Sequence, residues 1–121
     1  MKTHKDLQIW QKGISFVKTV YEATASYPQA EQFGLTSQMR RSAVSIPSNI
    51  AEGCGRNSNK ELVQFLYIAL GSSSELETQI IISNELGFLN KEKTDSILSM
   101  INEIIRMTSS LIQSIKTRTK D

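Results

Sequence analysis

The sequence contains few of the residues on which most protein chemistry depends. Its 121 residues include one cysteine, one histidine, one tryptophan and two prolines. A single cysteine cannot form a disulfide within the chain, and no apolar run approaches the roughly 20 residues needed to span a bilayer. The first ten residues are polar and lack the apolar core of a secretory signal. We therefore expect a cytoplasmic protein that makes no contact with a membrane.

The sequence also lacks the combinations of residues that identify enzymes and metalloproteins. His4 has no second ligand at a spacing that suits zinc, and Cys54 has no nearby histidine to activate it. Glu75 and Glu77 point roughly 200° apart on a helix, so they cannot act together as a general acid and base. No glycine-rich stretch leads into a GKS or GKT phosphate loop. We expect no catalytic residue, no metal site and no cofactor, and therefore no enzyme.

Charge is nearly balanced overall but is unevenly distributed. The net charge is +2, from 14 Lys and Arg against 12 Asp and Glu. Residues 61–90 contain no Lys or Arg, and their charges are all glutamates. A net charge of +2 is too small to indicate nucleic-acid binding by itself. The acidic segment suits contact with another subunit or a partner, and the alternative is a solvated acidic helix face.

The residues that are abundant predict helices. Apolar residues recur every three or four positions, and no alternating strand-like run is bounded by turn signals. Thr36, Ser58 and Asn90 are expected N-caps, whereas Pro28 and Gly87 end the helices before them. The expected helices span about residues 6–26, 36–54, 59–86 and 91–116. Short connections predict one all-α domain over residues 1–121, an antiparallel up-down-up-down four-helix bundle.

Each expected helix carries an apolar stripe that should face the core. The four stripes are Leu7, Trp10, Ile14, Val17, Tyr21 and Thr24; Met39, Ala43, Ile46 and Ile50; Leu62, Phe65, Ala69, Leu76 and Ile80; and Ile97, Ile101, Ile104, Thr108, Leu111 and Ile115. Leu66, Leu70 and Ile81 widen the third stripe. A second stripe on the last helix, Leu98, Ile105 and Ile112, predicts oligomerisation; alternatively, it covers a wide bundle core.

The helix expected over residues 36–54 is unusual because it contains Pro47 and a polar stripe. A proline there removes one amide and crowds the carbonyl of Ala43, which predicts a kink or, alternatively, two short helices. The polar stripe lies roughly 200° around the helix from the apolar stripe. It comprises Arg41, Ser45, Ser48 and Glu52.

The candidate site is a polar cluster around this helix. Its members are Arg40, Arg41, Asn49, Glu52, Arg56 and Glu75. If the second and third helices are neighbours, Arg41 and Glu75 can pair across them. The cluster is then either a structural polar network or a surface that binds a ligand, RNA or a protein partner, since arginines contact phosphates.

The stretch TSQMRRSAVSIPSNIAEGCGR, followed by NKELVQFLYIALGSSSELETQI, carries a family resemblance. With LQIWQKGISFVKTVYEAT and YPQAEQFGL before it, the chain closely resembles the four helix bundle proteins called 23S ribosomal RNA intervening sequence proteins, over about residues 5–115. The resemblance implies small bundles assembled into five-fold rings, with no established activity. A related branch, the accessory proteins of diversity-generating retroelements, forms a basic five-fold barrel that binds nucleic acid and a reverse transcriptase.

Residues and resemblance together predict a homo-oligomer, with a pentamer as the implied ring. The expected function is a non-enzymatic interaction protein that binds RNA or DNA weakly, or binds a protein partner. A ring would gather basic residues, namely Arg40, Arg41, Arg56, Lys116, Arg118 and Lys120. The alternative is an enzyme whose site lies at a subunit junction and uses Arg41, Glu52 and Glu75.

Overall fold

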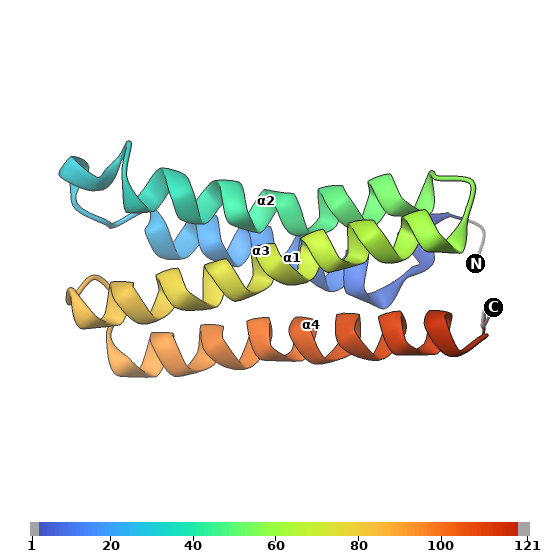
Figure 1. The fold of residues 1–121 in the computed structure, drawn as a ribbon. Helices are drawn as coiled ribbons and strands as arrows, with labels where there is room; N and C mark the ends of the chain where they lie inside the picture. Colours follow the sequence, from blue (N-terminus) through green and yellow to red (C-terminus); the bar gives the residue numbers. More distant parts are fainter. Residues whose placement is uncertain (1–2, 119–121) are drawn as a thin grey trace.

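The computed structural model describes residues 3–118, and over that range it contains helices and turns but no strand. The long helices are α1 Gln8–Thr24, α2 Leu35–Cys54, α3 Asn59–Glu85 and α4 Lys91–Arg118, and the short 3-10 helices are η1 His4–Asp6 and η2 Gln29–Glu31. In Figure 1 the four long helices lie alongside one another, with both chain ends at the same end of the molecule. The expected ranges lie within about two residues of these bounds.

Local signals fix the ends of α3 and α4. The Ser58 hydroxyl accepts a hydrogen bond from the Glu61 amide at 3.2 Å, and the Asn90 side chain accepts one from the Lys93 amide at 2.8 Å. Both residues are therefore N-caps, as the sequence indicated. Gly87 follows α3 with a φ of 80°, the left-handed conformation that glycine adopts readily at the end of a helix.

For α2 the expected N-cap is wrong, whereas the expected single helix through Pro47 is confirmed. Thr36 is not its N-cap, because the helix begins at Leu35, whose amide donates to the Glu31 carboxylate at 3.1 Å. The Glu31 carboxylate, at the end of η2, thus takes the capping role that the sequence predicts for Thr36. Pro47 does not divide the segment, since one continuous helix runs from Leu35 to Cys54, so the alternative of two short helices does not hold.

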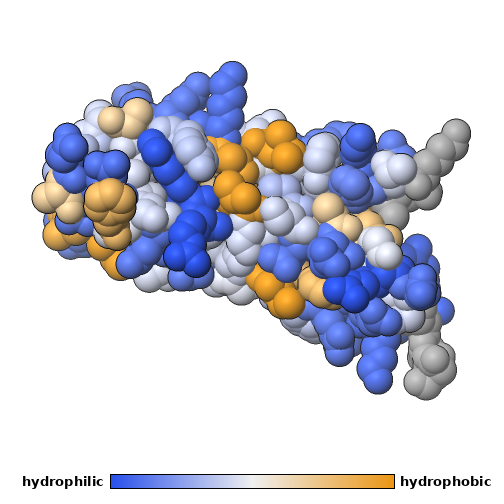
Figure 2. All heavy atoms as spheres, turned by 90° about the horizontal axis from the view of Figure 1, so that it is seen from above, coloured by the Kyte–Doolittle hydropathy of each residue, from blue (hydrophilic) through white to orange (hydrophobic). Residues whose placement is uncertain are grey.

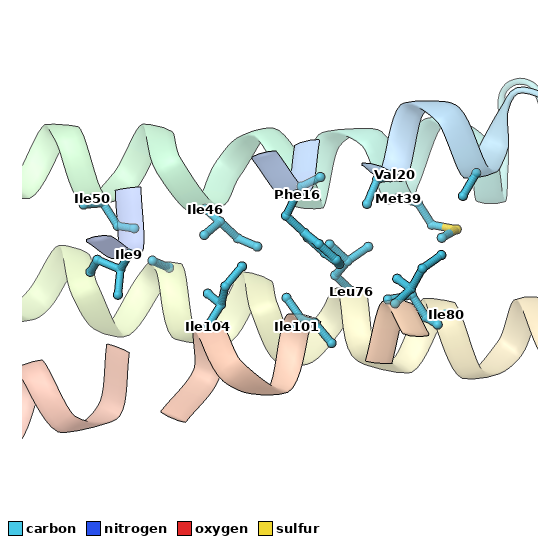
Figure 3. Close-up of a cluster of buried hydrophobic side chains, with 14 of the residues drawn as sticks. Ile9, Phe16, Val20, Met39, Ile46, Ile50, Leu76, Ile80, Ile101 and Ile104 are labelled. Atoms are coloured by element: carbon cyan, nitrogen blue, oxygen red, sulfur yellow. The ribbon is translucent and has the colours of Figure 1, made fainter. Parts of the chain in front are cut away.

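The core is a single cluster of aliphatic side chains with Phe16 near its centre (Figure 3). All four residues of the α2 stripe are buried, and so are five of the six residues of the α4 stripe, whose Leu111 is partly buried. In α3, Ala69, Leu76 and Ile80 are buried as expected. Ile81 is 47% exposed, so it does not widen the core stripe.

The expected core stripe of α1 is wrong in its orientation. Its buried residues are Ile9, Gly13, Phe16, Val20, Ala23 and Thr24. Ile14 and Tyr21 from the expected stripe are exposed. Both stripes have helical spacing, so the contact with α2 decides between them. Gly13 lies against Pro47, where an added Cβ would stand 3.4 Å from the proline ring, and this close approach turns the Ile9 and Phe16 stripe inward.

The second stripe of α4 is part of the core. Ile112 is only 3% exposed, and Leu98 and Ile105 are partly buried against the core cluster. The alternative of a wide bundle core is therefore the right one for these residues, and the structure contradicts a free apolar stripe on α4. The large hydrophobic side chains that are exposed lie elsewhere, at Ile14, Tyr21, Phe33, Val44, Tyr67, Ile68, Ile81, Ile82 and Leu86.

Candidate functional site

The middle of the α2 polar stripe joins α2 to α3. The hydroxyls of Ser45 and Ser72 lie 2.8 Å apart across the two helices. The Asn49 amide donates to the Ser45 carbonyl at 2.8 Å and to its hydroxyl at 2.9 Å. Ser45 and Asn49 lie two residues either side of Pro47, whose missing amide weakens the helix there. In this segment the polar residues bond to one another and to the backbone.

Arg56, two residues after the C-terminal end of α2, contacts two glutamates. Its guanidinium lies 2.8 Å from the Glu52 carboxylate, 4.0 Å from that of Glu61, and over the Phe65 ring at 4.8 Å. The charged groups are about half exposed. Exposed pairs of this kind contribute at most about 1 kcal/mol, so this group of residues holds the α2–α3 turn in place modestly.

Arg40 belongs to the contact between α2 and α1. Its guanidinium lies over the Tyr21 ring at 4.5 Å, and Nε donates to the Thr24 hydroxyl at 2.9 Å. A second nitrogen donates to the Tyr21 carbonyl at 3.3 Å. Arg40 is therefore occupied with the C-terminal end of α1 and satisfies carbonyl and hydroxyl groups there.

Arg41 and Glu75 do not form the ion pair that the sequence suggested. They line one hollow of about 320 Å³ between α2 and α3, but their charged atoms are not within the 4.0 Å of a salt bridge. Both residues are exposed, and water solvates each charge well enough that pairing would gain little. Arg41 thus leaves its guanidinium free on the surface.

The six residues of the polar cluster therefore do not form one site, because four lie at separate places along α2, Arg56 follows its end and Glu75 lies on α3. Arg41 and Glu52 are eleven residues apart, which is about 16 Å along a helix. Within residues 3–118, no group of three or more His, Cys, Asp and Glu side chains is placed to hold a metal ion. Burial raises the pKa of the Cys54 thiol, which keeps the sulfur protonated and weakly nucleophilic near neutral pH.

An apolar groove lies on the outer surface between α1 and α2. Its volume is about 310 Å³. It is lined by Trp10, Ile14, Val17, Val44, Pro47, Ser48 and Ala51, and we call it the α1/α2 groove. Figure 2, which looks down onto the α2 side, shows hydrophobic atoms gathered midway along the molecule, with further hydrophobic atoms at one end.

A wider hollow adjoins the groove at Val44. It has a volume of about 570 Å³, and Tyr21, Phe33 and Arg41 are among its lining residues. The Phe33 side chain is 90% exposed. The groove and this hollow together form an apolar strip along the α1/α2 side, with Arg40 and Arg41 at its edge.

A second apolar surface lies on the outward side of α3. It contains Tyr67, Ile68, Ile81, Ile82 and Leu86, each between 41% and 56% exposed, and we call it the α3 face. Between its two apolar ends lie the small or short side chains of Gly71, Ser74 and Thr78, all exposed. An added Cβ at Gly71 would meet nothing within 4 Å, so packing within the chain does not explain this glycine.

The sequence carries signals for both surfaces, although it predicts the candidate site at the polar cluster. The residues that line the α1 side of the groove are ones that helical spacing predicts to face the core. The spacing predicts the same for Ile81 of the α3 face. The clearest usable signal was α1 itself, because it has two apolar stripes of helical spacing and only one can face inward.

Taken together, these features define a class: a small four-helix protein with a closed core, no converging reactive groups among residues 3–118, and two exposed apolar surfaces. The family model of the 23S rRNA-intervening sequence proteins matches residues 5–110. The chain belongs to the 23S rRNA-intervening sequence protein family. No curated protein matches the sequence.

The fold is shared with a solved structure. That structure is a protein of unknown function from the S23 ribosomal protein family of Bacteroides thetaiotaomicron, with a TM-score of 0.78 and 24% sequence identity. The match covers 86% of this chain and 97% of the other. At this identity the similarity supports the helical fold. As for the membrane, none of the helices within residues 3–118 is long and apolar enough to cross one.

Proposed function

We propose that this protein is a non-enzymatic interaction protein that works as a homo-oligomer. Its four helices form an antiparallel up-down-up-down bundle, and its copies assemble into a closed ring for which five subunits is the expected number. The ring presents a repeated surface to a partner. That partner defines the cellular role of the ring.

The observation that carries the proposal is the exposed apolar surface. Five large hydrophobic side chains are exposed along α3, and a groove of about 310 Å³ with almost only apolar lining lies between α1 and α2. Large exposed apolar side chains that gather on one side of a protein commonly mark a binding surface. An enzyme is not favoured, because Arg41, Glu52 and Glu75 do not converge within the chain.

The mass of the protein in solution tests the proposal. The chain mass is 13.6 kDa, and light scattering coupled to gel filtration at micromolar concentration should give a defined multiple of it. The assembly should persist across moderate salt concentrations, because burial of apolar surface drives it. A mass equal to one chain at every concentration tested would refute it.

Weak binding of nucleic acid is a second candidate function, and the distribution of cations favours it. The short helix η1, which contains Lys5, and the start of α3, which contains Lys60, lie at the end of the molecule where Figure 1 places both chain ends. Arg56 lies between α2 and α3 at the same end and is paired with Glu52 and Glu61. Lys116 and Arg118, in the last turn of α4, lie at that end too. Lys120 lies outside the described residues. A ring of parallel copies would bring these cations together, so that phosphates meet a basic surface despite the low charge of each chain.

A further inference from the structure

We propose that the α3 face of one copy docks into the α1/α2 groove of the next copy. The proposal rests on the homo-oligomer proposed above and names its contact surfaces. The occupant of the groove is therefore a second copy of this chain, and the contact is heterologous: each subunit gives one surface and receives the other.

The charges of the two surfaces argue against a contact between the α3 faces of two copies. The outward side of α3 carries Glu75 and Glu85, neither of which forms an ion pair, and α3 contains no cation after Lys60. Lys116 of α4 donates to the Tyr67 hydroxyl at 3.2 Å, at the opposite end of the α3 face from Glu85. Two α3 faces brought together would oppose carboxylates to carboxylates, which is unfavourable.

The α1/α2 side has the opposite sign. Lys18 lies one turn from Ile14 and Tyr21, Arg40 stacks over Tyr21, and Arg41 lines the hollow that adjoins the groove. Glu22 is the one unpaired carboxylate among the described residues on this side. The α3 face and the α1/α2 side are therefore complementary in charge as well as apolar in character.

The heights of the matching groups along the bundle also agree. The Ser45–Ser72 hydrogen bond and the approach of Gly53 to Phe65 show which levels of α2 and α3 correspond. Counting along each helix at 1.5 Å per residue places Ile68 level with Asn49, and therefore level with the α2 side of the groove.

The same count extends the match along α3. Glu75 is level with Arg41, since both line the hollow between α2 and α3. Ile82 is level with Leu35, beside the hollow lined by Phe33 and Tyr21. A neighbour set alongside with its helices parallel to the first thus brings Ile68 to the groove, Glu75 to Arg41, and Ile82 to the wider hollow. Repetition of this contact closes a ring if the rotation permits.

Complementation between two blocked variants tests the proposal. Val44→Glu places a charge in the groove and leaves the α3 face intact, whereas Ile68→Glu blocks the α3 face and leaves the groove intact. Both positions are more than 40% exposed, so the folded chain accommodates glutamate. Gln113→Glu, at an exposed position of α4, adds the same charge away from both surfaces and serves as the control.

We expect each blocked variant alone to have the mass of one chain, and the control to keep the wild-type mass. Mixing the two blocked variants should give a species of two chains, because one free groove and one free α3 face remain. If the wild type assembles, a blocked variant that keeps the wild-type mass would overturn the proposal. A mixture of the two blocked variants that stays monomeric would overturn it too.

A monomeric wild-type protein is a separate outcome, and it would remove the proposed function itself. Circular dichroism confirms that each variant keeps its helices. If Val44→Glu or Ile68→Glu fails to fold, Ile14→Glu or Ile82→Glu blocks the same surface at a residue of similar exposure and decides the same question.

Discussion

Tyr27 is a buried residue whose hydroxyl has no hydrogen-bond partner in the structure. Burial raises the pKa of its phenol, because the charged form loses solvation, and the neighbouring Ser83 hydroxyl, which donates to the Gln79 carbonyl, offsets part of that rise. The neutral phenol is therefore favoured in the folded state. The stability that the neutral phenol gives the folded state is fully present below the unfolded pKa of about 10. It is lost as the pH rises through the higher pKa of the folded state.

Replacing Tyr27 with phenylalanine should remove an unsatisfied hydroxyl while keeping the ring contact with Phe88, whose centroid lies 5.3 Å away. We expect the free energy of unfolding at neutral pH to rise by about 1 kcal/mol. The variant should also lose less stability than the wild type above about pH 10. Urea unfolding at the two pH values measures both effects.

Tyr21→Phe is the matched control, since its ring is 43% exposed and should show neither change. A Tyr27→Phe variant clearly less stable than the wild type would mean that the hydroxyl makes a favourable bond in solution.

At the scale of elements, two glycines that look alike in sequence have opposite roles. Gly53 of α2 approaches α3 so closely that an added Cβ would lie 2.9 Å from the Phe65 Cβ and 3.2 Å from the Leu62 carbonyl oxygen. An added Cβ at Gly71 of α3 would meet nothing within 4 Å. Packing therefore requires glycine at the first position and does not require it at the second.

We expect Gly53→Ala to lower the free energy of unfolding by about 1–3 kcal/mol, because the two helices must move apart. Gly71→Ala should raise it by up to about 1 kcal/mol, because alanine favours the helix. Thermal melts measure both, in a Val44→Glu background so that assembly does not contribute. Equal effects of the two substitutions would show that the approach of α2 and α3 does not depend on Gly53.

On the scale of the whole molecule, nucleic-acid binding should depend on the end that carries the cations. We expect fluorescence anisotropy with a single-stranded RNA to detect weak binding at low salt. Its log affinity should fall with log salt by about 0.7 for each phosphate neutralised. Changing Lys116 and Arg118 to glutamate should abolish this binding.

The same change at Lys91 and Lys93, in the first turn of α4, alters the net charge equally at the opposite end and should leave most of the binding intact. Binding that persists at high salt would indicate specific recognition. No binding at low salt would favour a protein partner of the ring.

Much of the fold was determined by the sequence alone, because its causes are local. Ser58 and Asn90 begin helices through their own side chains, and Gly87 ends one through its own backbone freedom. The apolar stripe of α2 is its only one, so its burial followed from spacing. For the candidate site, spacing placed Arg41 and Glu52 on the outward side of α2, where they are exposed.

Only the tertiary structure decided which surface of each helix meets its neighbours. α1 carries two apolar stripes of the same spacing, and the Gly13–Pro47 contact selects between them. Ile112 and Ile81 are chemically identical, yet one is buried and the other exposed. The partner of Glu52 proved to be Arg56, while Arg41 and Glu75 share a hollow without pairing. The spacing of residues specifies which of them share one side of a helix. Burial and pairing depend on how the helices are rotated and packed against one another.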